Sequence, residues 1–191
     1  MHMMRKEIGR NLIGVLEIAL FMPAARTRFG DTKDEAIRSF LVPVLLFPLT
    51  MLGVYMIPQA MVDGSAHTIA LLYGLRTVAV WGLFFGAVYW IARQVNRMEH
   101  FYQFVIASNW LALPATLVFI PIGWMLLAGL HTWAELYPFM MCLIIYTYAF
   151  TGFMASCVLR IPWELAGFIV FIGMFVNDST LSLLHWVGDR L

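Results

Sequence analysis

The chain is poor in charge and in cysteine. Of its 191 residues only 12% are Asp, Glu, Lys or Arg and only two are Cys, whereas 62% are hydrophobic and the mean hydropathy is +0.82. An ordinary soluble domain carries about 25% charged residues, and a domain of this size still exposes about a third of its unfolded surface. The composition therefore excludes a water-soluble globule, and two cysteines are too few for a disulfide scaffold.

Signatures of catalysis and of nucleic-acid binding are also missing. The formal net charge is only +1, whereas nucleic-acid-binding domains carry a strongly basic patch. No GxSxG, HExxH, CxxC, Walker or Rossmann pattern is present. The acidic and His residues expected at one membrane face have no metal-binding spacing and are interpreted as scattered loop residues, namely Asp63, His67, His131, Glu135 and His185. We therefore expect a non-enzymatic protein without a metal or cofactor.

Five apolar stretches approach or exceed the roughly 20 residues that cross a bilayer. The predicted spans are Phe40–Met61, Thr68–Ala92, one within Phe101–Ala134, Leu136–Leu159, and one that starts at Pro162 and includes Asn177 and Asp178. The sequence therefore predicts an all-α bundle of five transmembrane helices over residues 31–191.

The third stretch, Phe101–Ala134, would reach about 50 Å as one straight helix. Pro114 and Pro121 are expected to kink or end it, with residues 124–133 lying along the membrane interface. A hairpin of two short spans is the alternative and would give six spans in all. We favour five, because the segment between the two prolines offers almost no polar side chain for a hairpin tip.

The distribution of cations indicates an orientation. If the N-terminus is cytoplasmic and the C-terminus outside, the cytoplasmic segments hold every Lys and Arg except Arg76 and Arg190. Cytoplasmic loops of membrane proteins are enriched in these residues. We therefore expect a multi-pass protein of the inner membrane that contacts the lipid bilayer.

Residues 1–30 form a separate cytoplasmic segment. Polar or small residues recur at helical spacing on one side, namely Glu7, Arg10, Gly14 and Glu17, and apolar residues lie on the other, namely Ile8, Leu12, Val15, Leu16 and Ala19. This pattern predicts an amphipathic helix in the membrane interface. A signal peptide is the alternative, and Glu17 within the apolar stretch argues against it.

Arg76 is the most informative single residue. An unpaired Arg at a helix centre costs about 2.5–3.5 kcal/mol, so a partner is expected. Asp178 falls at a similar depth on the last span, and Asn177 could complete the hydrogen bonds. The sequence therefore suggests an intramembrane ion pair, and the alternative is that Arg76 extends to the headgroups while Asp178 lies at the surface.

Small residues form a stripe on the second span, namely Ala70, Gly74, Gly82 and Gly86. Gly82 and Gly86 form a GxxxG pattern, which lets two helix backbones approach closely. The sequence favours packing against a helix of the same chain, and leaves open a protein partner or self-association through the Gly82/Gly86 face.

Two further polar groups are interpreted structurally. Arg160 and Glu164 lie four residues apart and are expected to form an interfacial pair. Gln103, Ser108 and Asn109 form a polar strip on the inner half of the third span, where hydrogen bonding between helices is favoured over ligand binding.

The segment ASNWLALPATLVFIPI, Ala107 to Ile122, resembles the third span of the YIP (Ypt/Rab-interacting-protein) superfamily, especially small bacterial members. The basic N-terminus, the connector from Pro23 and the five spans resemble that family's organisation over Phe29 to Val187. The resemblance implies a membrane-organising or partner-binding component. The D-L-Y-G-P motif of eukaryotic members is absent, so no functional residue is carried over.

Two alternative functions remain open. One is a small transporter or channel subunit that uses Arg76 and Asp178, and the other is an accessory subunit of a larger membrane complex.

Overall fold

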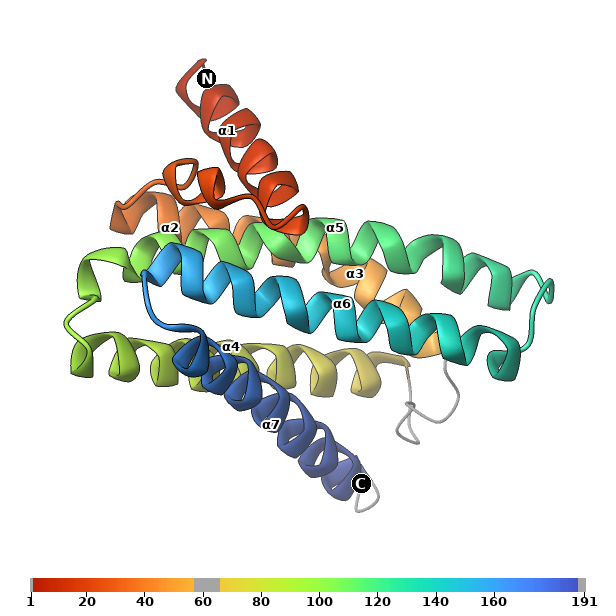
Figure 1. Cartoon of the computed structure of the whole chain (residues 1–191). Coiled ribbons are helices and arrows are strands. Elements are labelled where there is room, and N and C mark those ends of the chain that lie inside the picture. Colours follow the sequence, from red (N-terminus) through yellow and green to blue (C-terminus); the bar gives the residue numbers. More distant parts are fainter. Residues whose placement is uncertain (1, 57–65, 189–191) are drawn as a thin grey trace.

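Every element in the described part of the chain is helical. The computed structural model describes residues 2–56 and 66–188. The elements, shown in Figure 1, are α1 (His2–Ala19), η1 (Pro23–Thr27), α2 (Lys33–Ser39), α3 (Leu41–Met56), α4 (Ala66–Gln94), η3 (Met98–His100), α5 (Phe101–Leu127), α6 (Trp133–Leu159) and α7 (Trp163–Gly188). The all-α prediction is confirmed for these residues.

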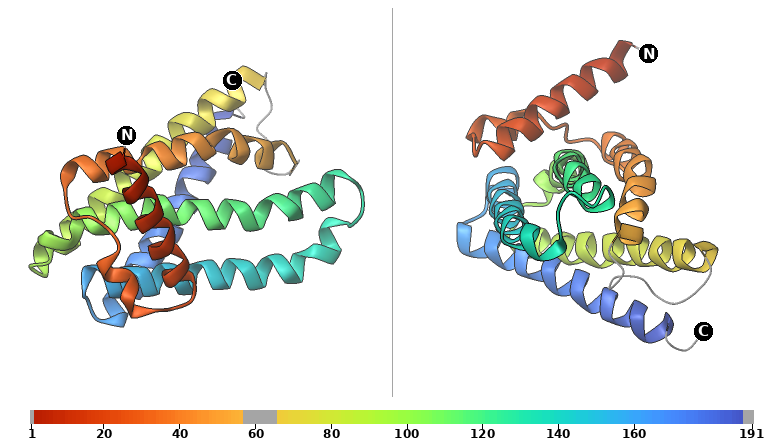
Figure 2. Two further views of the ribbon diagram at one scale, coloured as in Figure 1. Left: turned by 90° about the horizontal axis from the view of Figure 1, so that it is seen from above. Right: turned by 90° about the vertical axis from the view of Figure 1, so that its right-hand side faces the viewer.

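The helices are arranged in three layers. Viewed along the bundle, α5 lies between α3 and α6, with α4 and α7 on one side of this layer and α1 on the other (Figure 2). At one end α4 stops, α5 begins and α6 turns into α7 (Figure 1). We call this the cationic end, because Arg93, Arg97 and Arg160 lie in its turns. The opposite end is where α5 turns into α6.

Four helices are long and apolar enough to cross a membrane. They comprise His67–Gln94, Met98–Leu126, Trp133–Leu159 and Trp163–Gly188.

 This finding is compatible with a multi-pass integral membrane protein, and the four helices coincide with four of the five predicted spans. The first predicted span corresponds to α3, of which 16 residues are described, and its predicted remainder, residues 57–61, lies outside the described residues.

The third predicted span is one continuous helix. Helix α5 runs from Phe101 through Pro114 and Pro121 to Leu127, so the hairpin required by the six-span alternative does not form there. The prolines therefore do not end the helix, and residues 124–127 continue α5 rather than forming a separate segment. Prolines are tolerated in membrane helices because neighbouring helices and hydroxyl side chains stabilise the interrupted backbone, and the Thr116 hydroxyl donates to the Ala112 carbonyl at 2.8 Å in this region.

Helix α6 starts one turn earlier than predicted. It begins at Trp133 rather than at Leu136, so Pro138 lies inside the helix. The reason is a capping box: the Glu135 backbone N–H donates to the Thr132 hydroxyl at 3.4 Å, and the Thr132 N–H donates to the Glu135 carboxylate at 2.9 Å. These two bonds satisfy backbone donors that the helix itself leaves free.

Most of the buried side chains lie at the cationic end. The large core cluster combines the ends of α4 and α6 with the starts of α5 and α7, and includes Val88, Phe104, Val158 and Ile169. At the opposite end a separate small cluster contains only three buried residues, Ile69, Tyr73 and Leu184. The bundle is therefore packed closely at one end and more loosely at the other.

Candidate functional site

Helices α1 and α2 with η1 form a compact unit, which we call the N-terminal cap (residues 6–39). Three salt bridges cross it: Arg10 to Glu35 at 2.9 Å, Arg28 to Glu17 at 2.7 Å, and Arg38 to Glu7 at 2.9 Å. The predicted polar side of α1 is therefore turned toward the rest of the cap. The hydrogen bonds from Arg28 hold the pKa of the Glu17 carboxyl below its ordinary value.

The other sides of α1 divide between the protein and its surroundings. Val15 and Ile18 are buried in the large core, whereas Leu16 and Leu20 are 60% and 69% exposed. Gly14 lies against the connector, where an added Cβ would be 2.7 Å from Arg28 Cβ. With Glu7, Arg10 and Glu17 paired within the cap and Leu16 and Leu20 outward, α1 has the surface expected of a helix that contacts lipid.

The predicted polar strip on α5 lies against the cap. The Asn109 side chain donates to the Ser39 hydroxyl at 2.8 Å, and the Gln103 side chain donates to the Phe29 carbonyl at 3.4 Å. Ser108, the third residue of the strip, is half-buried. From α6, the Tyr146 hydroxyl donates to the Ala19 carbonyl at the end of α1. These bonds attach the cap to two helices of the bundle.

Arg76 contacts α7, but not through the predicted acid. Its guanidinium donates to the Asn177 side-chain oxygen at 2.6 Å and to the Asn177 carbonyl at 3.0 Å. Among the salt bridges between described residues, none joins Arg76 to Asp178, which is exposed. Adjacent residues of a helix point about 100° apart, so Asn177 can face α4 while Asp178 faces away. The predicted ion pair is therefore replaced by a bond between a charged side chain and a neutral amide.

The small-residue stripe of α4 has two different environments. Gly74 lies near α3, where an added Cβ would be 3.7 Å from Phe47. At Gly82 and Gly86 an added Cβ would meet no described atom within 4 Å, and both residues are exposed. Ala70 is half-buried. The GxxxG part of the stripe is thus not used for packing within the described chain, contrary to the interpretation that favoured a helix of the same chain.

The predicted pair of Arg160 and Glu164 is not formed. Both side chains are exposed, and no salt bridge between described residues joins them. Arg160 adopts a left-handed conformation with φ 55° after the end of α6, and α7 begins only at Trp163. The two residues are therefore not on one helix, and the four-residue spacing does not bring them together.

The polar residues expected at the opposite end are not gathered into a metal site. No group of three His, Cys, Asp or Glu residues suited to a metal occurs in the described ranges. His131 contacts Glu135 at 3.4 Å, beside the capping box of α6, while Asp63 lies outside the described residues. The Thr132–Glu135 spacing in the sequence is the signal that would have predicted this helix start.

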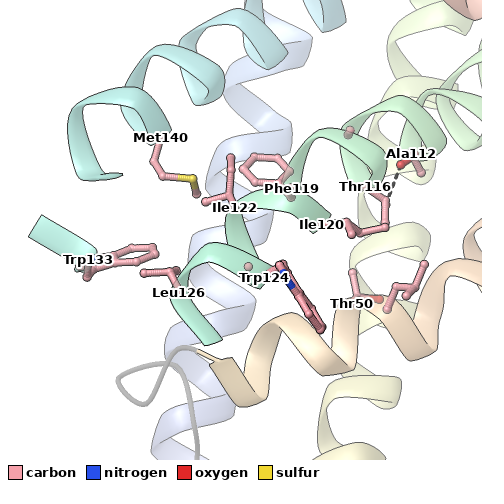
Figure 3. A pocket seen from close by; sticks show the side chains of 13 residues that line it. Thr50, Ala112, Thr116, Phe119, Ile120, Ile122, Trp124, Leu126, Trp133 and Met140 are labelled. Atoms are coloured by element: carbon pink, nitrogen blue, oxygen red, sulfur yellow. Dashed lines mark hydrogen bonds between the residues drawn. The ribbon is translucent and has the colours of Figure 1, made fainter. Parts of the chain in front are cut away.

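A feature that the sequence did not indicate is a groove between α3, α5 and α6 at the opposite end. It has a volume of about 520 Å³ and is lined mainly by apolar side chains (Figure 3), including Thr50, Thr116, Phe119, Trp124, Trp133 and Met140. Small residues of α5 make room for it, namely Ala112, Ala115 and Gly123. Its size falls within the range of small-molecule sites.

Comparisons with known proteins give no assignment. No family model matches the chain, and neither a curated protein nor a solved structure matches it.

Proposed function

We propose that the chain is a five-span, non-enzymatic protein of the inner membrane that binds a partner helix through the Gly82/Gly86 face of α4. In this proposal the N-terminus is cytoplasmic, the C-terminus is outside, and the protein is a membrane-organising component. Membership of the YIP superfamily is part of the proposal and rests on the resemblance of residues 107–122.

The five-span count is supported by the position of α3. Ser39, just before α3, bonds to Asn109 on α5, and Leu49 lines the same groove as residues near the far end of α5. Helix α3 therefore follows α5 along the bundle. Its 16 described residues are about 24 Å long, which is most of a hydrocarbon core about 30 Å thick.

Exposed tryptophans support the placement of the membrane. Trp90 and Trp163 lie near the cationic end, and Trp124 and Trp186 lie near the far ends of α5 and α7. Trp rings concentrate at the two interfaces of a bilayer. The cations of the α4–α5 and α6–α7 turns lie beyond the first pair, which favours a cytoplasmic location for that end.

The partner-binding role rests on the open surface at Gly82 and Gly86. Helix association in lipid depends on close backbone approach, because lipid chains are as apolar as the side chains they would replace. Gly74 already contacts α3, whereas the two later glycines have no neighbour in the described chain. A second helix could therefore approach α4 there without displacing any described side chain.

The experiment that tests this role replaces each glycine by leucine in the membrane-inserted full chain. We expect Gly82→Leu and Gly86→Leu to abolish either a co-purifying protein or a cross-linked dimer, with the chain still folded. Gly167→Leu on α7 is the matched control, since Gly167 is equally open and exposed. Association that survives both α4 substitutions, or that Gly167→Leu weakens as much, contradicts the proposal.

The topology is tested separately by labelling single cysteines in a background without Cys142 and Cys157. Cysteines at Asn96 and Lys33 should react only from the cytoplasmic side, and one at Leu130 only from outside. Labelling of Leu130→Cys and Asn96→Cys from the same side would contradict the proposed spans.

A further inference from the structure

The two hydroxyl side chains that line the groove between α3, α5 and α6 are already hydrogen-bonded within their own helices. The Thr116 hydroxyl donates to the Ala112 carbonyl of its own helix at 2.8 Å (Figure 3). The Thr50 hydroxyl donates to the Phe47 carbonyl at 2.8 Å. A polar ligand or a file of water molecules would find few partners on such walls. The ligand that suits these walls is a hydrocarbon.

The groove is long enough to hold the part of an acyl chain that lies within one leaflet of a bilayer. Along α5 it extends from Ala112 to Leu126, which is about 21 Å of helix. Half of a hydrocarbon core is about 15 Å, so a lipid chain lying along α5 would fill most of this length. Floor residues such as Ala112 and Ala115 are small, and the larger Phe119 and Ile122 form part of the walls.

The two ends of the groove differ in character. Trp124 and Trp133 lie at the end near the α5–α6 turn, and both are exposed. Indole rings at this depth would sit beside the headgroups. The Ala112 end lies near the middle of α5, among apolar residues. A lipid in the groove would therefore have its headgroup at the tryptophans and its chain end near Ala112.

We propose that this groove binds one acyl chain of a membrane phospholipid from the leaflet at the opposite end. The inference rests on the membrane placement proposed above, and it is independent of the Gly82/Gly86 face, which belongs to α4. An acyl chain is surrounded by hydrocarbon everywhere in the bilayer, so the hydrophobic effect does not favour the groove. Its preference for the groove comes from the fit of the chain between the three helices.

The test reconstitutes the full chain in phosphatidylcholine vesicles that contain a small share of photoreactive phosphatidylcholine. In one probe the diazirine is at the end of the acyl chain, and in the other it is close to the ester. After irradiation, adducts are located by mass spectrometry. We expect the first probe to label α5 around Ala112 and Thr116, and the second to label around Trp124 and Trp133, both more strongly than the exposed face of α7.

A variant that fills the groove gives the second arm of the test. The Phe ring of Ala115→Phe would occupy the space proposed for the acyl chain, so this variant should reduce labelling of residues 112–126 by about tenfold, which corresponds to about 1.4 kcal/mol. Ala115→Leu serves if the larger side chain disturbs folding. Ala79→Phe is the control, because Ala79 is exposed on α4 outside the groove. Its labelling pattern should match that of the original chain.

Each other outcome overturns the inference in a distinguishable way. Equal labelling of all exposed helices means that the groove has no preferred chain, and absence of all labelling means that the membrane placement itself fails. Reversed positions of the two probes contradict the proposed direction. Labelling by a photoreactive free fatty acid but not by the phospholipid assigns the groove to a different ligand. Protection of residues 112–126 in a cross-linked dimer assigns it to a second copy.

Discussion

The two ends of the bundle are built differently. At the cationic end the cap adds three salt bridges and contributes Val15, Ile18 and Phe29 to the large core. At the opposite end the buried cluster has three residues, and a groove of about 520 Å³ lies open between helices. The cap contributes to this difference because it packs against α5 and α6. Among residues 2–56 and 66–188, one end is covered by the chain itself and the other leaves a groove open.

The strongest way to break this contrast is to displace the cap. We expect Gly14→Ala to destabilise it by about 1–3 kcal/mol, because the new Cβ would lie 2.7 Å from Arg28 Cβ and 2.8 Å from the Phe29 ring. Gly9→Ala is the matched control on the same helix, with nothing within 4 Å, and should stabilise α1 by up to about 1 kcal/mol. Trypsin cleavage after Arg28, measured against time, reports the loss of the cap. Equal cleavage of both variants would contradict the close contact at Gly14.

At the opposite end, the bond between α4 and α7 should depend on Asn177 and not on Asp178. Asn177→Ala leaves the Arg76 charge with fewer acceptors, so we expect a loss of about 1–2 kcal/mol. Asp178→Asn should change stability by less than about 0.5 kcal/mol, as an exposed substitution does. Thermal unfolding in detergent measures both. The reverse ranking would restore the ion pair that the sequence suggested.

A smaller effect is expected at the start of α6. Thr132→Ala removes the hydroxyl that accepts from the Glu135 N–H, so the helix should lose about 1 kcal/mol. Thr151→Ala is the control within the same helix, since the Thr151 hydroxyl only donates to the Thr147 carbonyl one turn before it. Hydrogen exchange of the first turn of α6 should increase in the first variant alone. Unchanged exchange would show that the capping box is not important for the opposite end.

The smallest effect is a pH dependence confined to the cap. Because the pKa of Glu17 is lowered in the folded chain, its pairing with Arg28 stabilises the cap above the ordinary Glu value of 4.5, and this contribution is lost as the pH falls through the lowered pKa. Spin-label distances between α1 and α6 should lengthen in that acid range. Glu17→Gln should remove this part of the pH response, and a response that persists in the variant must come from another group.

The sequence predicted the helices better than their contacts. Apolar runs separated by charged turns predicted four of the spans, because the bilayer imposes a minimum length on each helix. The sequence could not distinguish Asn177 from Asp178 as the partner of Arg76, because the choice depends on how α7 is rotated about its axis. The Arg160–Glu164 pair failed because a left-handed residue interrupts the helical spacing.

Contacts between distant segments were not predictable from local patterns. The polar side of α1 was identified from its helical spacing, but its partners Arg28, Glu35 and Arg38 depend on how the connector folds back. The groove arises from small residues on one face of α5 with α3 and α6 on either side, and only the arrangement of three helices shows it. Sequence periodicity reports which face of a helix is apolar, and not what covers that face.

The attachment of α1 to α6 also sets an order of assembly. The residues of the cap that pair with α1 are at most 31 residues from their partners in sequence, so these pairs can form soon after the cap leaves the ribosome. Tyr146 is 127 residues after Ala19, and translation at about 5–20 residues per second delays it by roughly 6–25 seconds. During that interval α1 exposes Val15 and Ile18 without its final neighbours. The nascent chain therefore needs the nearby bilayer, or a chaperone, to shelter this helix until the later helices have been inserted.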